Sequence, residues 1–220
     1  MMIDIKKTFE TQDRWPLNVT KLDPGASRAF DASRGTYYVM LRDAGFYSDN
    51  VKLENVHGAV ATSGHFTIRS GLGSAVVIEY LGLHLLESRY YIQEKLDQGN
   101  LSYIDGGTNT TAINPGRLGD PVINYVHFPA HMYQTLHTHP SHRVGLILKG
   151  NGRVELDNHE YFSVPEGSAF FMRRNTLHNF ICDDQDVILF VFAPDSGTGP
   201  TDEVNPLKIR TYIGQQRHVR

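Results

Sequence analysis

The sequence predicts an all-β protein. Short segments rich in β-branched and aromatic residues recur about every ten residues in the second half of the chain, with turn residues between them. Residues 152–157 (GRVELD) alternate apolar and polar side chains, which is typical of a strand with one face in water. The sequence has no low-complexity tract and no helical repeat. Evenly spaced short strands of this kind indicate a sandwich or a barrel.

The composition is that of an ordinary globular protein. Of 220 residues, 40% are hydrophobic and 20% are charged, and the net charge is −3. Because the sequence has no basic stripe or polybasic patch, we expect neither nucleic acid nor a membrane as a partner. The N-terminal residues contain no apolar run long enough for a signal peptide, and the single cysteine, Cys182, cannot form an internal disulfide. We therefore expect a cytoplasmic protein, and base rates favour a homodimer.

The first half of the chain, residues 1–104, is predicted to be a strand-rich extension. Residues 1–35 contain prolines and glycines without a sustained period, which indicates an arm with at most short strands. Three later segments are rich in strand-forming residues and bounded by glycine: 36–41, 64–71 and 74–86. Residues 87–99 predict a helix, because four positions at roughly helical spacing lead to a glycine. The positions concerned are Leu86, Arg89, Ile92, Leu96 and Gly99.

The second half, residues 105–213, is predicted to form the working barrel, followed by a tail at 214–220. A polar loop at 106–120 separates it from the first half. Seven strand-like segments follow, at 122–128, 143–150, 152–157, 160–164, 168–173, 178–182 and 186–194.

Closely spaced histidines open this second half. His137 and His139 are two residues apart, so on a strand both imidazoles project from the same face and can converge on one ion. Neutral imidazole is a common ligand of zinc and iron in proteins. An HxH pair alone is a moderate signal, and the competing interpretation is polar decoration of a strand.

The wider pattern resembles the cupin superfamily of small β-barrels. The first cupin motif is matched by His131 in a glycine position, His137, His139, Arg143 in the glutamate position and Gly150. The second is matched by Gly167, the residues around Asn175, His178, and Cys182 in an asparagine position. The resemblance implies a double-stranded β-helix, a jelly-roll-like barrel, with the first half as an extension or a degenerate second cupin module. It also implies that His137, His139 and His178 hold a divalent transition metal.

Arg143 replaces the carboxylate ligand of typical cupins. Without that hard anionic ligand, an imidazole-rich site favours iron, zinc, copper or nickel over manganese or magnesium, and we expect Fe(II) first. A guanidinium beside an ion needs an anion between them, so Arg143 is a candidate anchor for a substrate carboxylate or phosphate. Two alternatives stay open: Arg143 pairs with an acidic side chain of the wall, or a bulge turns Arg143 outward and His142 inward as a fourth ligand.

Other residues near the motif are weaker candidates. Tyr133 and Gln134 precede the ligands and can hydrogen-bond a ligand or a bound oxygen species, although a tyrosine there also suits simple packing. His131 suits the mouth of the cavity or, more simply, an exposed loop. We expect Cys182 to be buried and inert, and three residues to line the barrel: Phe170, Met172 and Phe180.

Two functions follow from these residues. The first is a metal-dependent enzyme acting on a small, acidic molecule, most simply in a dioxygenase-type reaction, because the three-histidine set resembles cupin dioxygenases. Lyases and isomerases share the scaffold, since a fold does not fix the chemistry. The second is a non-catalytic module that binds or senses a small acidic or sugar-like ligand.

Overall fold

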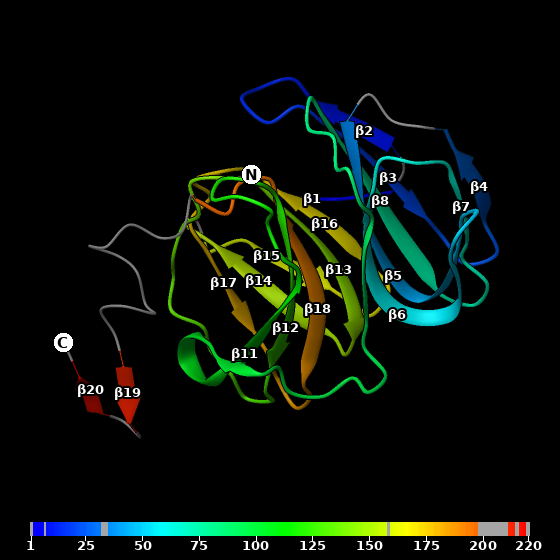
Figure 1. Cartoon of the computed structure of the whole chain (residues 1–220). Helices are drawn as coiled ribbons and strands as arrows, with labels where there is room; N and C mark the ends of the chain where they lie inside the picture. The colour runs from blue at the N-terminus through cyan, green and yellow to red at the C-terminus, as the bar shows by residue number, and fades with distance from the viewer. Residues whose placement is uncertain are drawn as a thin grey trace.

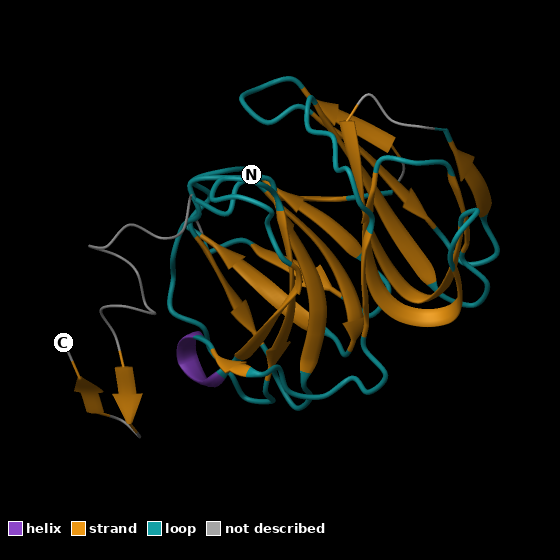
Figure 2. Cartoon of the chain, in the orientation of Figure 1, coloured by secondary structure: helices purple, strands orange, loops and turns teal. Residues whose placement is uncertain are grey.

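The computed structural model describes residues 2–6, 8–31, 35–157 and 159–197, together with the strands β19 (Thr211–Ile213) and β20 (Gln216–His218). Strands make up almost all of its regular structure, which confirms the predicted all-β class (Figure 2). Of the expected tail at 214–220, only β20 is described, and it pairs with β19. Among the described residues no helix is long and apolar enough to cross a membrane.

The first half forms an eight-stranded antiparallel sheet. Its strands follow the order β2-β3-β8-β5-β6-β9, and β4 and β7 pair with each other, with β7 also joined to β5. The strands are β2 (Thr8–Thr11), β3 (Leu17–Leu22), β4 (Ser27–Phe30), β5 (Gly35–Tyr47), β6 (Lys52–Thr62), β7 (Phe66–Arg69), β8 (Ser74–Leu81) and β9 (Arg89–Ile92). The strands within 1–35 are short, as expected, but β3 is a central member of this sheet.

The helix predicted at 87–99 is wrong. Residues Arg89–Ile92 are strand β9, which pairs antiparallel with β6 from Gly58 to Ala61. The segment contains Tyr90, Tyr91 and Ile92, which are strand formers, and the free edge of β6 offers them backbone partners. This long-range pairing outweighs the helical spacing of a few apolar residues.

The second half consists of a seven-stranded sheet and a three-stranded sheet. The larger sheet has the order β1-β16-β13-β18-β12-β11-β10, and the smaller has the order β15-β14-β17. The strands are β1 (Met2–Asp4), β10 (Leu101–Ser102), β11 (Thr108–Ile113), β12 (Val122–Phe128), β13 (Arg143–Lys149), β14 (Gly152–Leu156), β15 (Tyr161–Val164), β16 (Ala169–Met172), β17 (His178–Ile181) and β18 (Val187–Ala193). A short 3-10 turn, η1 (Ile104–Gly106), precedes β11.

The first strand of the chain lies in the second sheet. β1 pairs antiparallel with β16, with Met2 opposite Met172. After β1 the chain crosses to the N-terminal sheet, the other group of strands in Figure 1, and it returns to the seven-stranded sheet at β10. The division at residue 104 therefore stays a prediction, because β1 and β10, which precede it, belong to the seven-stranded sheet of the second half.

The two large sheets pack face to face and share a hydrophobic core. On β8, Val76 and Ile78 point into this core, whereas Ala75 and Val77 point into the interior of the N-terminal half. On β13, Leu146 faces the shared core as well. Burying one such side chain stabilises the fold by about 1.5–3 kcal/mol, so the shared core ties the two halves together strongly.

The N-terminal half fills its own interior with aromatic rings. Phe66 stacks on Phe30 and on Phe46, with centroid distances of 5.0 Å in both pairs. Tyr37 meets the edge of Phe66 at 5.1 Å. The interior of the C-terminal half differs, because there the inner faces of β12, β13, β16 and β18 border a cavity.

Candidate metal centre and ligand cavity

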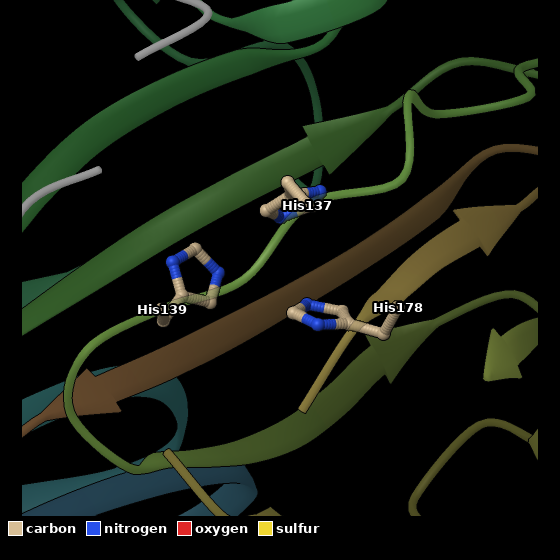
Figure 3. A group of neighbouring side chains, drawn as sticks. All are labelled: His137, His139 and His178. Atoms are coloured by element: carbon tan, nitrogen blue, oxygen red, sulfur yellow. The ribbon is translucent and has the colours of Figure 1, made fainter. Parts of the chain in front are cut away.

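Three histidines lie together on the wall of this cavity. His137 and His139 come from the segment before β13, and His178 is the first residue of β17. One ring nitrogen of each lies within 4.8 Å of the others, and the ring centroids are 4.5 to 5.2 Å apart. Figure 3 shows the three imidazoles arranged around a common space. The fold thus brings together the three histidines that the two sequence motifs single out.

Backbone hydrogen bonds hold these histidines in place. The N–H groups of His137 and His178 each donate to the carbonyl of the other at 3.0 Å. The carbonyl of His139 accepts the N–H of Asn175 at 2.7 Å. Backbone carbonyls orient two of the rings, as they do in many metal-binding histidines. Nδ1 of His137 lies 2.8 Å from the carbonyl oxygen of Thr135, and Nδ1 of His178 lies 2.8 Å from the carbonyl oxygen of Thr176.

These contacts fix the tautomer of two rings. If Nδ1 donates its proton to a carbonyl, the lone pair of the neutral ring is on Nε2. His139 has a buried Nδ1 without a hydrogen-bond partner among the described residues. A buried ring nitrogen without a partner is costly, and coordination of an ion would satisfy it. The donor set therefore fits a metal ion held by imidazole nitrogens.

Burial keeps the three rings neutral. It lowers the pKa of His137, lowers the pKa of His139 well below its usual value, and lowers the pKa of His178 to about 3. The positive charge of Arg143 lowers all three pKa values further. Neutral imidazole is the form that coordinates metal ions, so the group is ready to bind without losing protons at neutral pH.

Arg143 points into the cavity beside the histidines. Its Nη1 donates to the carbonyl of His142 at 2.8 Å and to the carbonyl and hydroxyl oxygens of Ser141 at 3.2 and 2.7 Å. Among the described residues, Nε and Nη2 have no hydrogen-bond partner, and Arg143 forms no ion pair. Burial lowers the pKa of Arg143 to about 10, so the side chain is still charged at neutral pH. Three of its five N–H donors are therefore left for a ligand.

The cavity is small and mostly apolar. Its volume is about 190 Å³. The three side chains expected to line the barrel do so, which confirms that prediction: Phe170, Met172 and Phe180. A Cβ added at Gly145 would lie 2.2 Å from the Phe170 ring, so the glycine makes the space that this ring occupies. Polar side chains also line the cavity, among them the three histidines and Arg143.

Gln134 provides one of these polar groups. The side chain is buried, and its Oε1 accepts the N–H of Phe180 at 3.2 Å. This bond fixes the orientation of the amide, and Nε2 has no partner among the described residues. The amide is therefore a hydrogen-bond donor on the cavity wall.

Two of the residues proposed from the sequence lie elsewhere. Nδ1 of His142 accepts the N–H of Arg174 at 3.0 Å, and its Nε2 donates to Oδ2 of Asp13 at 2.7 Å. Both ring nitrogens are therefore occupied outside the cavity, and the arrangement with His142 turned inward is not the one observed. Tyr133 is 61% exposed, and its hydroxyl donates to Glu155 outside the cavity.

Some predicted features of the surroundings are confirmed. The side chain of His131 is 76% exposed, as expected for a loop histidine. Cys182 is buried, and burial raises the pKa of its thiol to about 12, which suits an inert residue.

Several cavity residues were missed by the sequence. They are Tyr103, Asn109, Asn124 and Asp195. Asp195 lies close enough to Arg143 for its charge to raise the pKa of the guanidinium, which counteracts part of the effect of burial. Oδ1 of Asn109 is buried without a hydrogen-bond partner among the described residues. No motif marks these positions, because β11 and β12 place the two asparagines through sheet pairing alone.

Comparisons with known proteins agree with this architecture. Residues 119–195 match the family model of the AraC-like ligand binding domain. No curated protein matches the sequence.

Solved structures with a similar fold include the cupin 2 conserved barrel domain protein from Leptotrichia buccalis. It has a TM-score of 0.60 and 13% identity, with 89% of each chain covered. AerE from Microcystis aeruginosa has a TM-score of 0.57 and 13% identity, over 88% of this chain and 96% of the other. Salicylate 1,2-dioxygenase from Pseudaminobacter salicylatoxidans has a TM-score of 0.54 and 11% identity, over 82% of this chain and 70% of the other. At these identities the likeness is one of fold, and the fold that it shows is the cupin β-barrel.

Proposed function

We propose that this cupin is a metal-dependent enzyme that acts on a small, anionic molecule in a dioxygenase-type reaction. The observation that carries the proposal is the convergence of His137, His139 and His178, with two of the rings oriented by backbone carbonyls. A salicylate 1,2-dioxygenase with a similar fold supports the reaction class by analogy.

The three histidines would hold the ion, and Fe(II) is the ion that we favour. The group contains no carboxylate, so hard ions gain little from it, whereas zinc, nickel and copper are alternatives and manganese is less favoured. A bound Fe(II) would supply a Lewis acid and a means of activating oxygen. The chain itself contributes neutral imidazoles, a largely dry wall and fixed hydrogen-bond donors.

Arg143 would bind the anionic group of the substrate. Its free Nε and Nη2 form the planar fork that suits a carboxylate, and the apolar walls restrict water around it. Gln134 would donate a hydrogen bond to an oxygen atom of the same ligand. A volume of about 190 Å³ is below the ~300–1,000 Å³ of pockets for drug-sized ligands, so the substrate is a small molecule.

Metal analysis and oxygen uptake test this proposal together. Protein purified without oxygen should contain near-stoichiometric iron, and the His137→Ala variant should contain little. The loaded protein should then consume oxygen with at least one member of a panel of small carboxylates. Absence of every transition metal from the wild type, also after reconstitution with Fe(II), would refute the metal centre.

The match to the AraC-like ligand binding domain favours a second candidate, a non-catalytic binding or sensing module. Such a module would bind a small carboxylate through Arg143 and consume no oxygen. Tight binding without turnover, in protein loaded with each candidate metal, would select this alternative. The homodimer and the cytoplasmic location stay predictions, and light scattering of the purified protein tests the first of them.

A further inference from the structure

The segment that carries His137 contains an extra residue. Tyr133 stands opposite Ile181 in the pairing with β17, whereas His137 stands opposite His178. Four steps along one strand therefore match three along the other, which is the definition of a β-bulge. The additional residue lies within Thr135–Leu136, between the backbone bonds of Gln134 and His137.

This bulge decides which way His137 faces. In a regular strand, side chains two residues apart share a face, and those three apart do not. Gln134 and His137 are three apart, yet both line the cavity. Without the extra residue, Leu136 would point inward and His137 outward, because a one-residue slip exchanges the faces of a strand. The sequence suggested a bulge at His142, but it lies before His137 instead.

A carboxylate holds the bulge from the side. Oδ2 of Asp105 accepts the N–H of Thr135 at 2.5 Å, and Oδ1 accepts the Thr135 hydroxyl at 3.2 Å. These two bonds fix the backbone and the side chain of Thr135. The carbonyl of the same residue accepts the Nδ1–H of His137. The orientation of the imidazole thus depends on a carboxylate that does not touch it.

The turn that carries Asp105 is held by burial and by backbone hydrogen bonds. Ile104 is buried, and the N–H groups of Tyr103 and Gly107 donate to the carbonyls of Gly107 and Ile104 at 2.8 and 3.0 Å. Asp105 has φ of 54° and ψ of 35°. This left-handed conformation costs a non-glycine residue energy, which favourable contacts must offset. The two bonds to Thr135 provide such contacts.

We propose that Asp105 is a positioning residue for His137: it pins the bulge that turns the imidazole into the cavity, and so sets the affinity of the three-histidine group for a metal ion. The inference rests on the proposed metal centre. Asp105 would act through Thr135 and would contact neither metal nor substrate.

Metal affinity measured by competition with a chromophoric chelator is the main test, with Zn²⁺ and Co²⁺ as probes. Asp105→Ala should bind both ions about 10–100-fold more weakly than the wild type, as loss of a supporting hydrogen bond to a ligand commonly does. It should also change the visible absorption of bound Co²⁺. Asp105→Asn keeps one acceptor oxygen for the Thr135 N–H, so it should recover part of the affinity. Thr135→Val, which loses only the hydroxyl bond, should have a smaller effect than Asp105→Ala.

The matched control is Asp120→Ala. Asp120 also accepts a loop N–H, that of Arg117 at 2.9 Å, and it does not line the cavity. It should lower thermal stability without changing metal affinity. If Asp105→Ala is destabilised but binds Zn²⁺ and Co²⁺ as the wild type does, the inference is wrong. If that variant fails to fold, Asp105→Asn and Thr135→Val decide by the same measurement.

A second readout separates failure of the inference from failure of the metal centre. In metal-free protein, ¹⁵N NMR should show His137 in the tautomer protonated at Nδ1, and Asp105→Ala should populate the other tautomer. If the wild type binds no metal, the proposed function fails, and the tautomer of His137 still decides the role of Asp105. An unchanged tautomer in the variant would then overturn that role.

Discussion

Replacing Arg143 with leucine should abolish most carboxylate binding. The wild-type guanidinium has Nε and Nη2 free of protein partners, and at neutral pH it is charged because its pKa is about 10. A carboxylate would form two charge-assisted hydrogen bonds there, each worth about 1.5–3 kcal/mol. Even the lower sum, about 3 kcal/mol, corresponds to a loss of about 100-fold in affinity at ~1.4 kcal/mol per tenfold.

Isothermal titration calorimetry with matched ligand pairs measures this loss. Small aromatic and aliphatic carboxylates would be compared with their neutral amides, in metal-free and metal-loaded protein. Arg143→Leu should weaken the acids by about 100-fold and change the amides little. Arg143→Lys should be intermediate, because lysine keeps the charge without the planar fork. In the wild type, acid binding should weaken as the pH rises through about 10, where the guanidinium loses its proton.

Arg153→Leu is the matched control for this experiment. Arg153 lies on the outer face of β14, where its Nη2 donates to Oδ1 of Asp183 at 2.7 Å, so its loss should leave carboxylate affinity unchanged. Equal affinities of the wild type and Arg143→Leu for the acids would refute the reasoning. The same conclusion would follow if the wild type bound no acid more tightly than its amide.

Three further predictions concern the centre and the core. Because burial lowers the pKa of His178 from 6.5 to about 3, the unfolded chain takes up a proton there in this pH range and the folded chain does not. Metal-free protein should therefore lose stability as the pH falls from about 6.5 towards 3, and a urea midpoint that stays constant would contradict this. His142→Phe should keep its full metal content in elemental analysis, because that ring is bound to Asp13 outside the cavity, whereas His178→Ala should lose the metal. Phe192→Ala should cost about 3–5 kcal/mol in denaturant unfolding, since the ring is fully buried against Tyr38 in the core shared by the sheets. A cost below about 1 kcal/mol there would mean that the two halves do not support each other.

The residues that could be predicted are those with a local signature. The period of two predicted a strand at β14, where Val154 is buried and Arg153 exposed as expected, although Glu155, a polar position of the same alternation, is buried. The HxH spacing singled out His137 and His139, and the resemblance to the cupin motifs added His178; the structure brings these three side chains together. These features depend on short stretches of chain.

The residues that escaped prediction depend on distant partners. His142 looked like a ligand, but its hydrogen bond to Asp13 joins positions 129 residues apart, and no local pattern reveals it. Tyr133 precedes the bulge, and its face could not be assigned before the pairing with β17 was known. Strand β9 was mistaken for a helix for the same reason, because the edge of β6 lies far away in the sequence.

The three histidines are held by anchors from separate parts of the chain. His137 depends on the bulge and on Asp105, His178 on its pairing with His137, and His139 on the N–H of Asn175. These anchors come together only when the seven-stranded and three-stranded sheets have formed, so the unfolded chain contains no such site. An ion that binds the group must therefore bind the folded state almost exclusively, and its binding free energy adds to the stability of the fold. The same coupling works in reverse, because any substitution that loosens one anchor lowers both the affinity for the ion and the stability of the fold. The ratio of these two losses identifies the anchor.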